Sequence, residues 1–479
     1  MKKIIVAVLI TIGLSTFFFL KREKSRNRVP NLNKIYSNPA QHHSLQTHPV
    51  IVIPGIMGSN LIHSKTGQNA WGVFHGNYLN PSTAEGLQAL ALKPQSMASL
   101  SNYMTPVVAD GVLKNFEFKF LGLTLESKGY LHIMQTLGIG GFRDEALYPQ
   151  APEYANQHFT CFQFGYDWRL SNAQNAKKLH KFILEKEAYL KEEIQRRHGI
   201  EVEDLKFNIV AHSMGGLLSR YYARYGDQPL PKEGLPDLNW AGAKHINHLF
   251  LVSTPNSGSV VPLLELIEGR KIPNKRVKKF LGLSLDEYPK ELLGTFPSVY
   301  ELFPRKRHYT LVNQDQEPLD LFSVSLWEDQ KWGLAGSDKK TLKSIIPGDY
   351  TDEKRERLAL EHLEKCLKNA RQFHTALDVP VSSKPDHLSI SLYAGDVFNT
   401  TAQLMLNQKT GELRPSIYKP GDETVIRASV LANENMVNEN PVVDSPIPYD
   451  QVFFIFKKHM AMTEDSHFAD NLLFQLLQQ

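Results

Sequence analysis

The chain has 479 residues, of which 42% are hydrophobic and 22% charged, a composition typical of a folded globular protein with one large core or two domains. The formal net charge is +4, but the first 28 residues alone contribute +6, which leaves about −2 for the rest. This balance gives no sign of a nucleic-acid-binding surface. The two cysteines, Cys161 and Cys366, exclude a disulfide framework.

The N-terminal segment predicts a membrane anchor. Basic residues flank the apolar run of residues 4–20, two before it and five after it. Seventeen residues is near the short limit for a bilayer span, and no Ala-x-Ala site follows that would direct cleavage. We therefore expect residues 1–28 to form an uncleaved single-pass anchor, the alternative being a signal segment removed on secretion. Positive charge on both flanks leaves the side of the membrane open.

The rest of the chain is expected to be a linker followed by one catalytic domain. Residues 29–48 are polar, with Pro, Asn, Ser and His, and are predicted to be the linker. Residues 49–479 then form the catalytic domain. The β-branched run at residues 48–53, where linker and domain meet, predicts a buried first strand.

The elements that follow alternate between strands and helices. Residues 160–166 predict a second strand, and Ser171 is a typical N-cap for a helix that ends at Gly199. Apolar strands alternating with helices indicate a mostly parallel sheet covered on both faces, which is an α/β fold. Further strands are predicted at residues 205–210, 246–252, 388–393 and 452–456, and a closing helix at residues 464–477.

Two long stretches interrupt this alternation. Residues 60–155 contain Pro, Gly and scattered apolar clusters, and residues 256–385 mix basic, acidic and helical segments. Insertions after the strands of such a sheet commonly form a cap over the site, so we expect a cap or lid here rather than peripheral decoration. Within the first stretch, Trp71 and the apolar clusters of residues 116–137 are candidates for lipid contact, with core packing as the equal alternative.

The pentapeptide Ala-His-Ser-Met-Gly at residues 211–215 is the main indication of chemistry. It lies between a predicted strand and a predicted helix, so the sharp turn would expose the hydroxyl of Ser213 at the edge of the sheet. The small residues Ala211 and Gly215 allow strand and helix to approach closely. The flanking elements make a nucleophilic serine the favoured interpretation.

A nucleophilic serine requires a histidine base downstream, because the order in this architecture is serine, acid, histidine. His459 directly follows the last predicted strand and is therefore expected at the same sheet edge as Ser213. His467 falls inside the closing helix, and His212 belongs to the turn and is expected to point away from the nucleophile. His459 is the predicted base.

The acid has two candidates. Asp422 follows Gly421 in a turn, where a carboxylate is well placed to reach a histidine, although Gly-Asp is also common in ordinary turns. Asp396 immediately follows the strand predicted at residues 388–393. We favour Asp422, with Asp396 as the rival.

An oxyanion hole requires two backbone N–H groups. Met214, the residue after the nucleophile, would supply one. The loop after the first strand, Pro-Gly-Ile-Met-Gly at residues 54–58, would supply the other, with Ile56 as the preferred donor and Met57 as the alternative.

Together with the serine turn at residues 211–215, four further segments resemble, in their order along the chain, the lecithin:cholesterol acyltransferase family, which includes phospholipid:diacylglycerol acyltransferases and lysosomal phospholipases. They are residues 49–59, the motif Tyr-Asp-Trp-Arg-Leu at residues 166–170, Gly-Asp-Glu-Thr-Val at residues 421–425, and His-Met-Ala-Met at residues 459–462. The resemblance implies an α/β-hydrolase fold. It also implies a triad of Ser213, Asp422 and His459, and an oxyanion hole of Ile56 and Met214.

The resemblance further implies acyl transfer from a lipid or phospholipid ester, through an acyl-serine, to an alcohol or to water at a membrane surface. No metal site, phosphate-binding loop or other cofactor is indicated by the sequence. Two alternatives remain: a carboxylesterase or triacylglycerol lipase of the same fold, and a catalytically inactive lipid-binding protein. The presence of all three triad partners argues against the inactive alternative.

Overall fold

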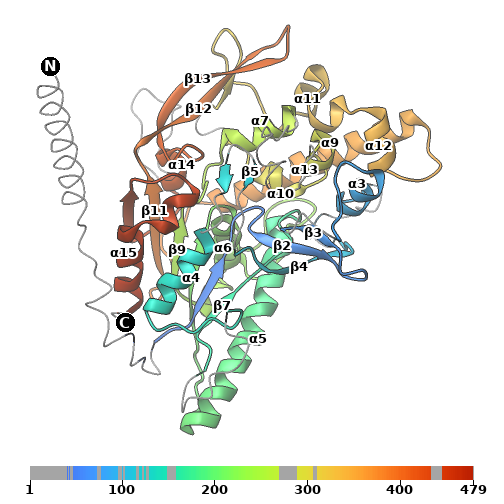
Figure 1. The fold of residues 1–479 in the computed structure, drawn as a ribbon. Helices are drawn as coiled ribbons and strands as arrows, with labels where there is room; N and C mark the ends of the chain where they lie inside the picture. The colour runs from blue at the N-terminus through green and yellow to red at the C-terminus, as the bar shows by residue number, and fades with distance from the viewer. Residues whose placement is uncertain are drawn as a thin grey trace, which may run out of the picture.

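The fold is that of a computed structural model (Figure 1). It describes residues 40, 43 and 47–477, apart from residues 73–76, 95–99, 101–102, 115–117, 121–122, 126–128, 148–157, 269–287, 306–309 and 433–444. The predicted anchor, residues 1–28, and most of the predicted linker, residues 29–48, lie outside the described residues. Within the described part, none of the helices has the length and apolar character needed to cross a membrane.

A six-stranded parallel sheet forms the centre of the molecule, with strand order β14-β11-β9-β8-β1-β7. The predicted mostly parallel α/β fold is therefore confirmed, and each strand corresponds to one of the six apolar runs identified in the sequence. The strands are β1 (Val50–Ile53), β7 (Cys161–Gln163), β8 (Phe207–His212), β9 (Ile246–Val252), β11 (Ser389–Gly395) and β14 (Gln451–Ile455).

Helices cover both faces of this sheet. Alternate residues of a strand point to opposite faces. In β1, Ile51 and Ile53 belong to the core cluster shared with α5 (Asn172–His198), α6 (Met214–Tyr225) and α13 (Asp352–Asp378). Val50 and Val52 instead join a second cluster, with α4 (Gly129–Ile139) and α15 (Ser466–Leu477). The sheet therefore has two separate cores.

The caps of α5 agree with the sequence. The Ser171 side chain accepts a hydrogen bond from the N–H of Gln174 (3.3 Å), and Gly199 ends the helix in the left-handed region with φ of 68°. The apolar face of the helix, which includes Leu179 and Ile183, is buried against the sheet.

The first long stretch, residues 60–155, contains a small antiparallel sheet and the hairpin β5–β6 as well as α4. The small sheet has strand order β3-β2-β4. Its elements are β2 (Ser59–His63), β3 (Asn69–Trp71), α3 (Ala84–Leu90), β4 (Val107–Val112), β5 (Phe118–Phe120) and β6 (Leu123–Leu125). Helix α4 packs directly on the central sheet, in the second core cluster.

The second long stretch, residues 256–385, is mainly helical. Its helix α12 contacts α3, so the two stretches meet beside the central sheet (Figure 1). Its elements are α7 (Val260–Glu268), α9 (Lys290–Leu293), α10 (Pro297–Glu301), β10 (Leu311–Val312), α11 (Val324–Gln330), α12 (Lys339–Ile345), α13 and the 3-10 turn η6 (Gly333–Gly336).

A projecting hairpin was not anticipated from the sequence. It consists of β12 (Phe398–Asn407) and β13 (Glu412–Gly421), which pair with β10 in a separate three-stranded sheet (Figure 1). The hairpin returns the chain to the carboxyl edge of the central sheet, just before Asp422. The remaining elements are α14 (Arg427–Leu431) and the 3-10 turns η4 (Ala243–His245) and η7 (Met460–Glu464). Both cysteines are buried and free.

Candidate active site

Ser213 lies at a strained turn between β8 and α6. Its backbone has φ of 53° and ψ of −124°, an unfavourable combination for a residue with a side chain, and its N–H is held by the carbonyl of Val252 (2.8 Å). A Cβ at Gly215 would lie 2.5 Å from the carbonyl oxygen of Pro54, and one at Gly216 would lie 1.9 Å from Oγ1 of Thr254. The two glycines therefore let the helix start against the backbone of Pro54 and the side chain of Thr254. The strand–turn–helix geometry expected from the sequence is present.

His459 faces this serine. It follows β14, the edge strand that pairs with β11, and its Nε2 lies 2.9 Å from Oγ of Ser213. Both side chains are buried, with exposed fractions of 2% for His459 and 6% for Ser213. His467 lies on the exposed start of α15, where it bonds Asp465 (3.0 Å). The structure thus brings His459, and not His467, to the serine.

Asp422 completes a continuous chain of hydrogen bonds. Its Oδ2 lies 2.8 Å from Nδ1 of His459, and its Oδ1 accepts the N–H groups of Thr424 (3.0 Å) and Val425 (2.7 Å). The backbone also contributes, because the N–H of His459 donates to the carbonyl of Asp422 (3.0 Å). The carboxylate is therefore fixed on both oxygens.

Asp396, the rival acid, is engaged elsewhere. Its Oδ1 accepts from the guanidinium of Arg427 (2.9 Å). The preceding residue, Gly395, explains how Asp422 reaches the site instead. A Cβ at Gly395 would lie 2.5 Å from Cβ of Asp422, so the absence of a side chain there leaves room for the acid.

The groups around Asp422 keep its carboxyl ionised. Burial by itself would raise the pKa of Asp422, but His459 and the two backbone N–H donors outweigh it and lower the pKa below its usual value. An ionised Asp422 only accepts hydrogen bonds, so Nδ1 of His459 is the protonated nitrogen. Nε2 is then free to accept the hydroxyl proton of Ser213. This is the tautomer that a general base requires.

The loop after β1 passes directly beside the serine. A Cβ at Gly55 would lie 2.8 Å from Cβ of Ser213. The N–H of Gly55 donates to Oη of Tyr130 (2.7 Å), and its carbonyl accepts from the N–H of Gly58 (3.0 Å). In a trans peptide, N–H and C=O point in opposite directions, so the N–H of Ile56 points away from this small turn.

Met214 lies on the other side of Ser213, as the first residue of α6. The N–H groups of the first helical turn have no partner within the helix and can bind an anion. Both residues predicted to donate to an oxyanion, Ile56 and Met214, therefore belong to segments in contact with Ser213.

Two aromatic residues support the loop. The indole N–H of Trp71 donates to the carbonyl of Met57 (2.9 Å), and the Trp71 ring packs edge-on against Trp168 with centroids 5.3 Å apart. Trp71 is 1% exposed, so it is a core residue in this structure and not a lipid contact. Tyr166 also reaches the loop, because its Oη donates to the carbonyl of Pro54 (3.0 Å).

The motif at residues 166–170 has a structural role beyond this. Asp167 and Arg169 form a fully buried ion pair (2.8 Å), and Arg169 also donates to the carbonyl of Leu90 at the end of α3 (2.6 Å). These bonds join the first long stretch to the segment after β7.

The sequence did not identify Tyr130 as a residue near the site. It also did not predict the contacts that His212 makes there. Oη of Tyr130 lies 3.0 Å from Nδ1 of His212, whose Nε2 lies 3.2 Å from the carbonyl oxygen of His459. The two nitrogens of His212 thus contact Tyr130 and the backbone of His459. No local pattern identifies Tyr130, which lies on α4 in a stretch expected to form a cap.

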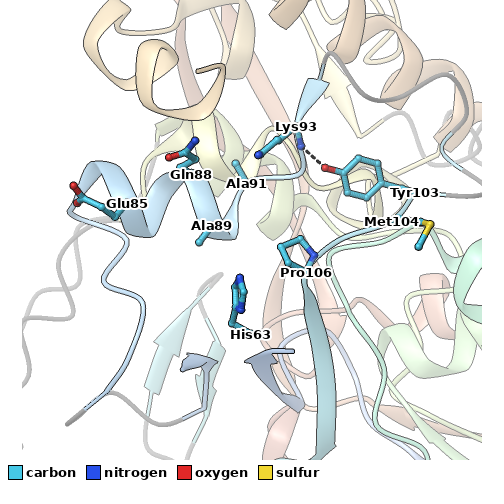
Figure 2. Close-up of a pocket in the computed structure, with 9 residues that line it drawn as sticks. All are labelled: His63, Glu85, Gln88, Ala89, Ala91, Lys93, Tyr103, Met104 and Pro106. Atoms are coloured by element: carbon cyan, nitrogen blue, oxygen red, sulfur yellow. Dashed lines mark hydrogen bonds between the residues drawn. The ribbon is translucent and has the colours of Figure 1, made fainter. Parts of the chain in front are cut away.

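A separate pocket of about 340 Å³ opens between α3 and the segment that precedes β4 (Figure 2). Ser213, Asp422 and His459 are not among its lining residues. Tyr103 closes one side, where its Oη accepts the backbone N–H of Lys93 (2.6 Å). The pocket is lined by His63, Glu85, Gln88, Ala89, Ala91, Lys93, Tyr103, Met104 and Pro106.

Comparison with known proteins supports the resemblance found in the sequence. The family model described as lecithin:cholesterol acyltransferase matches residues 154–348, a range that contains Ser213 but neither Asp422 nor His459. The resemblance is thus confirmed over that range. No curated protein sequence matches the chain.

The solved structures that resemble the chain include one from "The crystal structure of Tle4-Tli4 complex", with a TM-score of 0.54 and 14% identity, covering 91% of this chain and 99% of that one. This likeness shows a shared fold over most of both chains. Lipase 1 from Pelosinus fermentans has a TM-score of 0.30 and 12% identity, with coverage of 90% and 99%. EstA from Clostridium botulinum has a TM-score of 0.32 and 12% identity, with coverage of 92% and 90%.

Proposed function

We propose that the protein is a serine-dependent lipid acyltransferase or phospholipase, in which Ser213 is the nucleophile, His459 the general base and Asp422 the acid that orients it. The proposal rests on one observation, the buried hydrogen-bonded chain from Oγ of Ser213 through both nitrogens of His459 to Oδ2 of Asp422. Each bond in it has the direction that proton removal from the serine needs.

In the first half of the reaction, Oγ of Ser213 attacks the carbonyl carbon of the ester while Nε2 of His459 takes the hydroxyl proton. The negative charge that develops on the carbonyl oxygen is stabilised by the N–H groups of Ile56 and Met214. The tetrahedral intermediate then collapses, the ester C–O bond breaks, and His459 returns the proton to the leaving alcohol. The acyl group remains on Ser213.

In the second half, an acceptor hydroxyl loses its proton to His459 and attacks the acyl-serine. The bond between the acyl carbon and Oγ of Ser213 then breaks, and His459 returns the proton to Oγ. With water the product is a free fatty acid, and with an alcohol it is a new ester. The same triad serves both outcomes, which differ in access of the acceptor and exclusion of water. A lipid ester as donor is favoured by the match to the acyltransferase family over residues 154–348.

The test uses the full-length chain with vesicles of acyl-labelled phosphatidylcholine, with and without a long-chain alcohol or sterol. We expect labelled fatty acid, or labelled ester on the acceptor, with wild type and none with Ser213→Ala. Hydrolysis of p-nitrophenyl butyrate without any lipid turnover would favour the carboxylesterase alternative. Equal absence of all products in wild type and variant would contradict an enzymatic function and favour a lipid-binding protein.

We also propose that residues 1–28 hold the catalytic domain at a membrane. Their apolar run and basic flanks support this. Deletion of residues 1–28 should move the protein from the membrane fraction to the soluble fraction, with p-nitrophenyl butyrate hydrolysis unchanged. A full-length chain that a carbonate wash removes from membranes, or a truncated chain that still pellets with them, would contradict the anchor.

A further inference from the structure

A second line of hydrogen bonds lies behind the Ser213–His459–Asp422 chain, and the reaction described above does not use it. It runs from the N–H of Gly55 to Oη of Tyr130 (2.7 Å), from Tyr130 to Nδ1 of His212 (3.0 Å), and from Nε2 of His212 to the carbonyl oxygen of His459 (3.2 Å). Tyr130 and His212 are both buried. The line therefore connects the loop after β1 to the backbone of the proposed base.

The chemistry of the acceptors fixes the direction of every bond. A carbonyl oxygen only accepts, so Nε2 of His212 carries the proton. In a neutral ring Nδ1 is then unprotonated and accepts the hydroxyl proton of Tyr130. The oxygen of Tyr130 accepts the N–H of Gly55 in turn. Each donor in the line is matched by one acceptor.

A neutral His212 suits its surroundings. Burial, together with the nearby His459, lowers the pKa of His212 to about 3, although Asp422 acts in the opposite direction. The ring centroids of His212 and His459 are only 4.9 Å apart. A charged His212 would oppose the positive charge that His459 acquires during the reaction, and a neutral one does not.

We propose that Tyr130 and His212 are positioning residues that hold the loop after β1 (residues 54–58) and the backbone of His459 in one fixed arrangement about Ser213. The inference rests on the proposed function, because only that reaction requires the N–H of Ile56 and the ring of His459 to act on the same substrate ester group. Misplacement of reacting groups by about 1 Å can cost about 100-fold in rate. Interactions made only in the transition state affect kcat and not KM.

The kinetic test is Tyr130→Phe, which keeps the ring and removes only the hydroxyl. The N–H of Gly55 and Nδ1 of His212 would then both be buried without a partner, and the loop would shift to satisfy them. We expect kcat for p-nitrophenyl butyrate to fall about 10- to 100-fold, with KM within about threefold.

A matched control is Tyr225→Phe, which also removes a buried hydroxyl that donates to a backbone carbonyl, that of Ala376 (2.7 Å). Tyr225 lies at the opposite end of α6 from Ser213. The control should lower the melting temperature as much as Tyr130→Phe does and leave kcat unchanged. Equal kcat in the two variants, or a loss confined to KM, would overturn the inference.

Variants of His212 test whether the two residues act as one unit. His212→Gln retains a donor for the carbonyl of His459 and should keep more activity than His212→Ala. The double variant Tyr130→Phe, His212→Ala should lose no more than about threefold beyond the larger single loss, since coupled residues are not additive. Losses that multiply would instead mean independent roles and overturn the inference.

A spectroscopic readout separates this inference from the proposed function, because it does not depend on turnover. In ¹⁵N-histidine-labelled protein, the signals of His212 are assigned by their loss in His212→Gln. We expect His212 to remain neutral with its proton on Nε2 between pH 8 and pH 5, and its Nδ1 signal to shift in Tyr130→Phe. A proton on Nδ1, or titration near pH 6.5, would overturn the inference even in an active enzyme. Failure to turn over lipid, with the expected spectrum, would contradict only the substrate proposal.

Discussion

Two carboxylates, Asp396 and Asp422, were candidates for the partner of His459, and the hydrogen bonds of each separate them. Asp396 directly follows β11, yet it pairs with Arg427. Asp422 arrives from the end of the β12–β13 hairpin, and the N–H groups of the turn after it fix its Oδ1, which leaves Oδ2 for the histidine. The sequence favoured Asp422 because it follows Gly421 in a turn. The side-chain hydrogen bonds then show which of the two acids contacts His459.

The two acids give a matched pair of variants. In Asp422→Asn the amide no longer fixes the tautomer of His459, and we expect kcat to fall by about 10⁴-fold, as found for the equivalent change in a serine triad. Asp396→Asn loses only a partly exposed ion pair and should stay within about threefold. The measurement is kcat for p-nitrophenyl butyrate. A larger loss in Asp396→Asn than in Asp422→Asn would reverse the assignment.

At the scale of elements, the parts predictable from sequence are those with continuous apolar patterns or clear caps. The six central strands and α5 belong to this group, because their burial on a sheet face imposes a pattern on the sequence. The hairpin β12–β13 was missed because β13 is almost wholly exposed and contains Pro415 and Pro420, so no alternation marks it. Helix α4 was not predicted because its stretch of the sequence lacks a regular apolar period. The position of Tyr130, which lies on this helix, was therefore not predicted either.

Close packing between elements leads to a second prediction. Gly395→Ala places a Cβ 2.5 Å from Cβ of Asp422, so β11 or the acid must shift, and we expect at least a 10-fold loss of kcat. Gly138 on α4 has open space around it and no positive φ, so Gly138→Ala should leave kcat unchanged. The control should also raise stability by about 0.5–1 kcal/mol, measured by denaturant unfolding. Equal kcat in both variants would show that the site tolerates the added methyl group.

At the scale of the whole molecule, several histidines are buried in neutral form in different parts of the fold. Burial is the main cause in each case, and it lowers the pKa to about 3 or about 4. They are His212 (about 3), His248 (about 4), His362 (about 4) and His374 (about 3). Glu301 shows the opposite effect, because burial raises its pKa to about 7.

These groups predict that the fold loses stability in mild acid. Each histidine binds a proton near pH 6.5 when unfolded but only near pH 3–4 when folded. The unfolded state therefore binds more protons as pH falls below 6.5, and the free energy of unfolding drops by up to about 1.4 kcal/mol per pH unit for each histidine. As the pH falls, Glu301 binds its proton at a higher pH in the folded chain than in the unfolded chain. Between pH 7 and pH 4.5 it therefore offsets the stability lost through about one histidine.

The measurement is the urea midpoint of residues 29–479 at pH 7 and at pH 5. We expect a lower midpoint at pH 5, and a weaker pH dependence in His248→Gln, which removes one of the four titrating rings. Midpoints that do not differ between the two pH values would mean that these histidines bind protons equally well in the folded and unfolded chain.

The place of β14 in the sheet bears on how the protein is made. Chains are synthesised from the N-terminus at about 5–20 residues per second. His459 follows Ser213 by 246 positions, so it emerges roughly 12 to 50 seconds later. Until then Ser213 lacks the histidine proposed as its base, and β11 is an open strand edge, since β14 is its outer neighbour. Under the proposed function, a nascent chain on the ribosome is therefore expected not to react with esters, because Ser213 is activated only when the last strand docks.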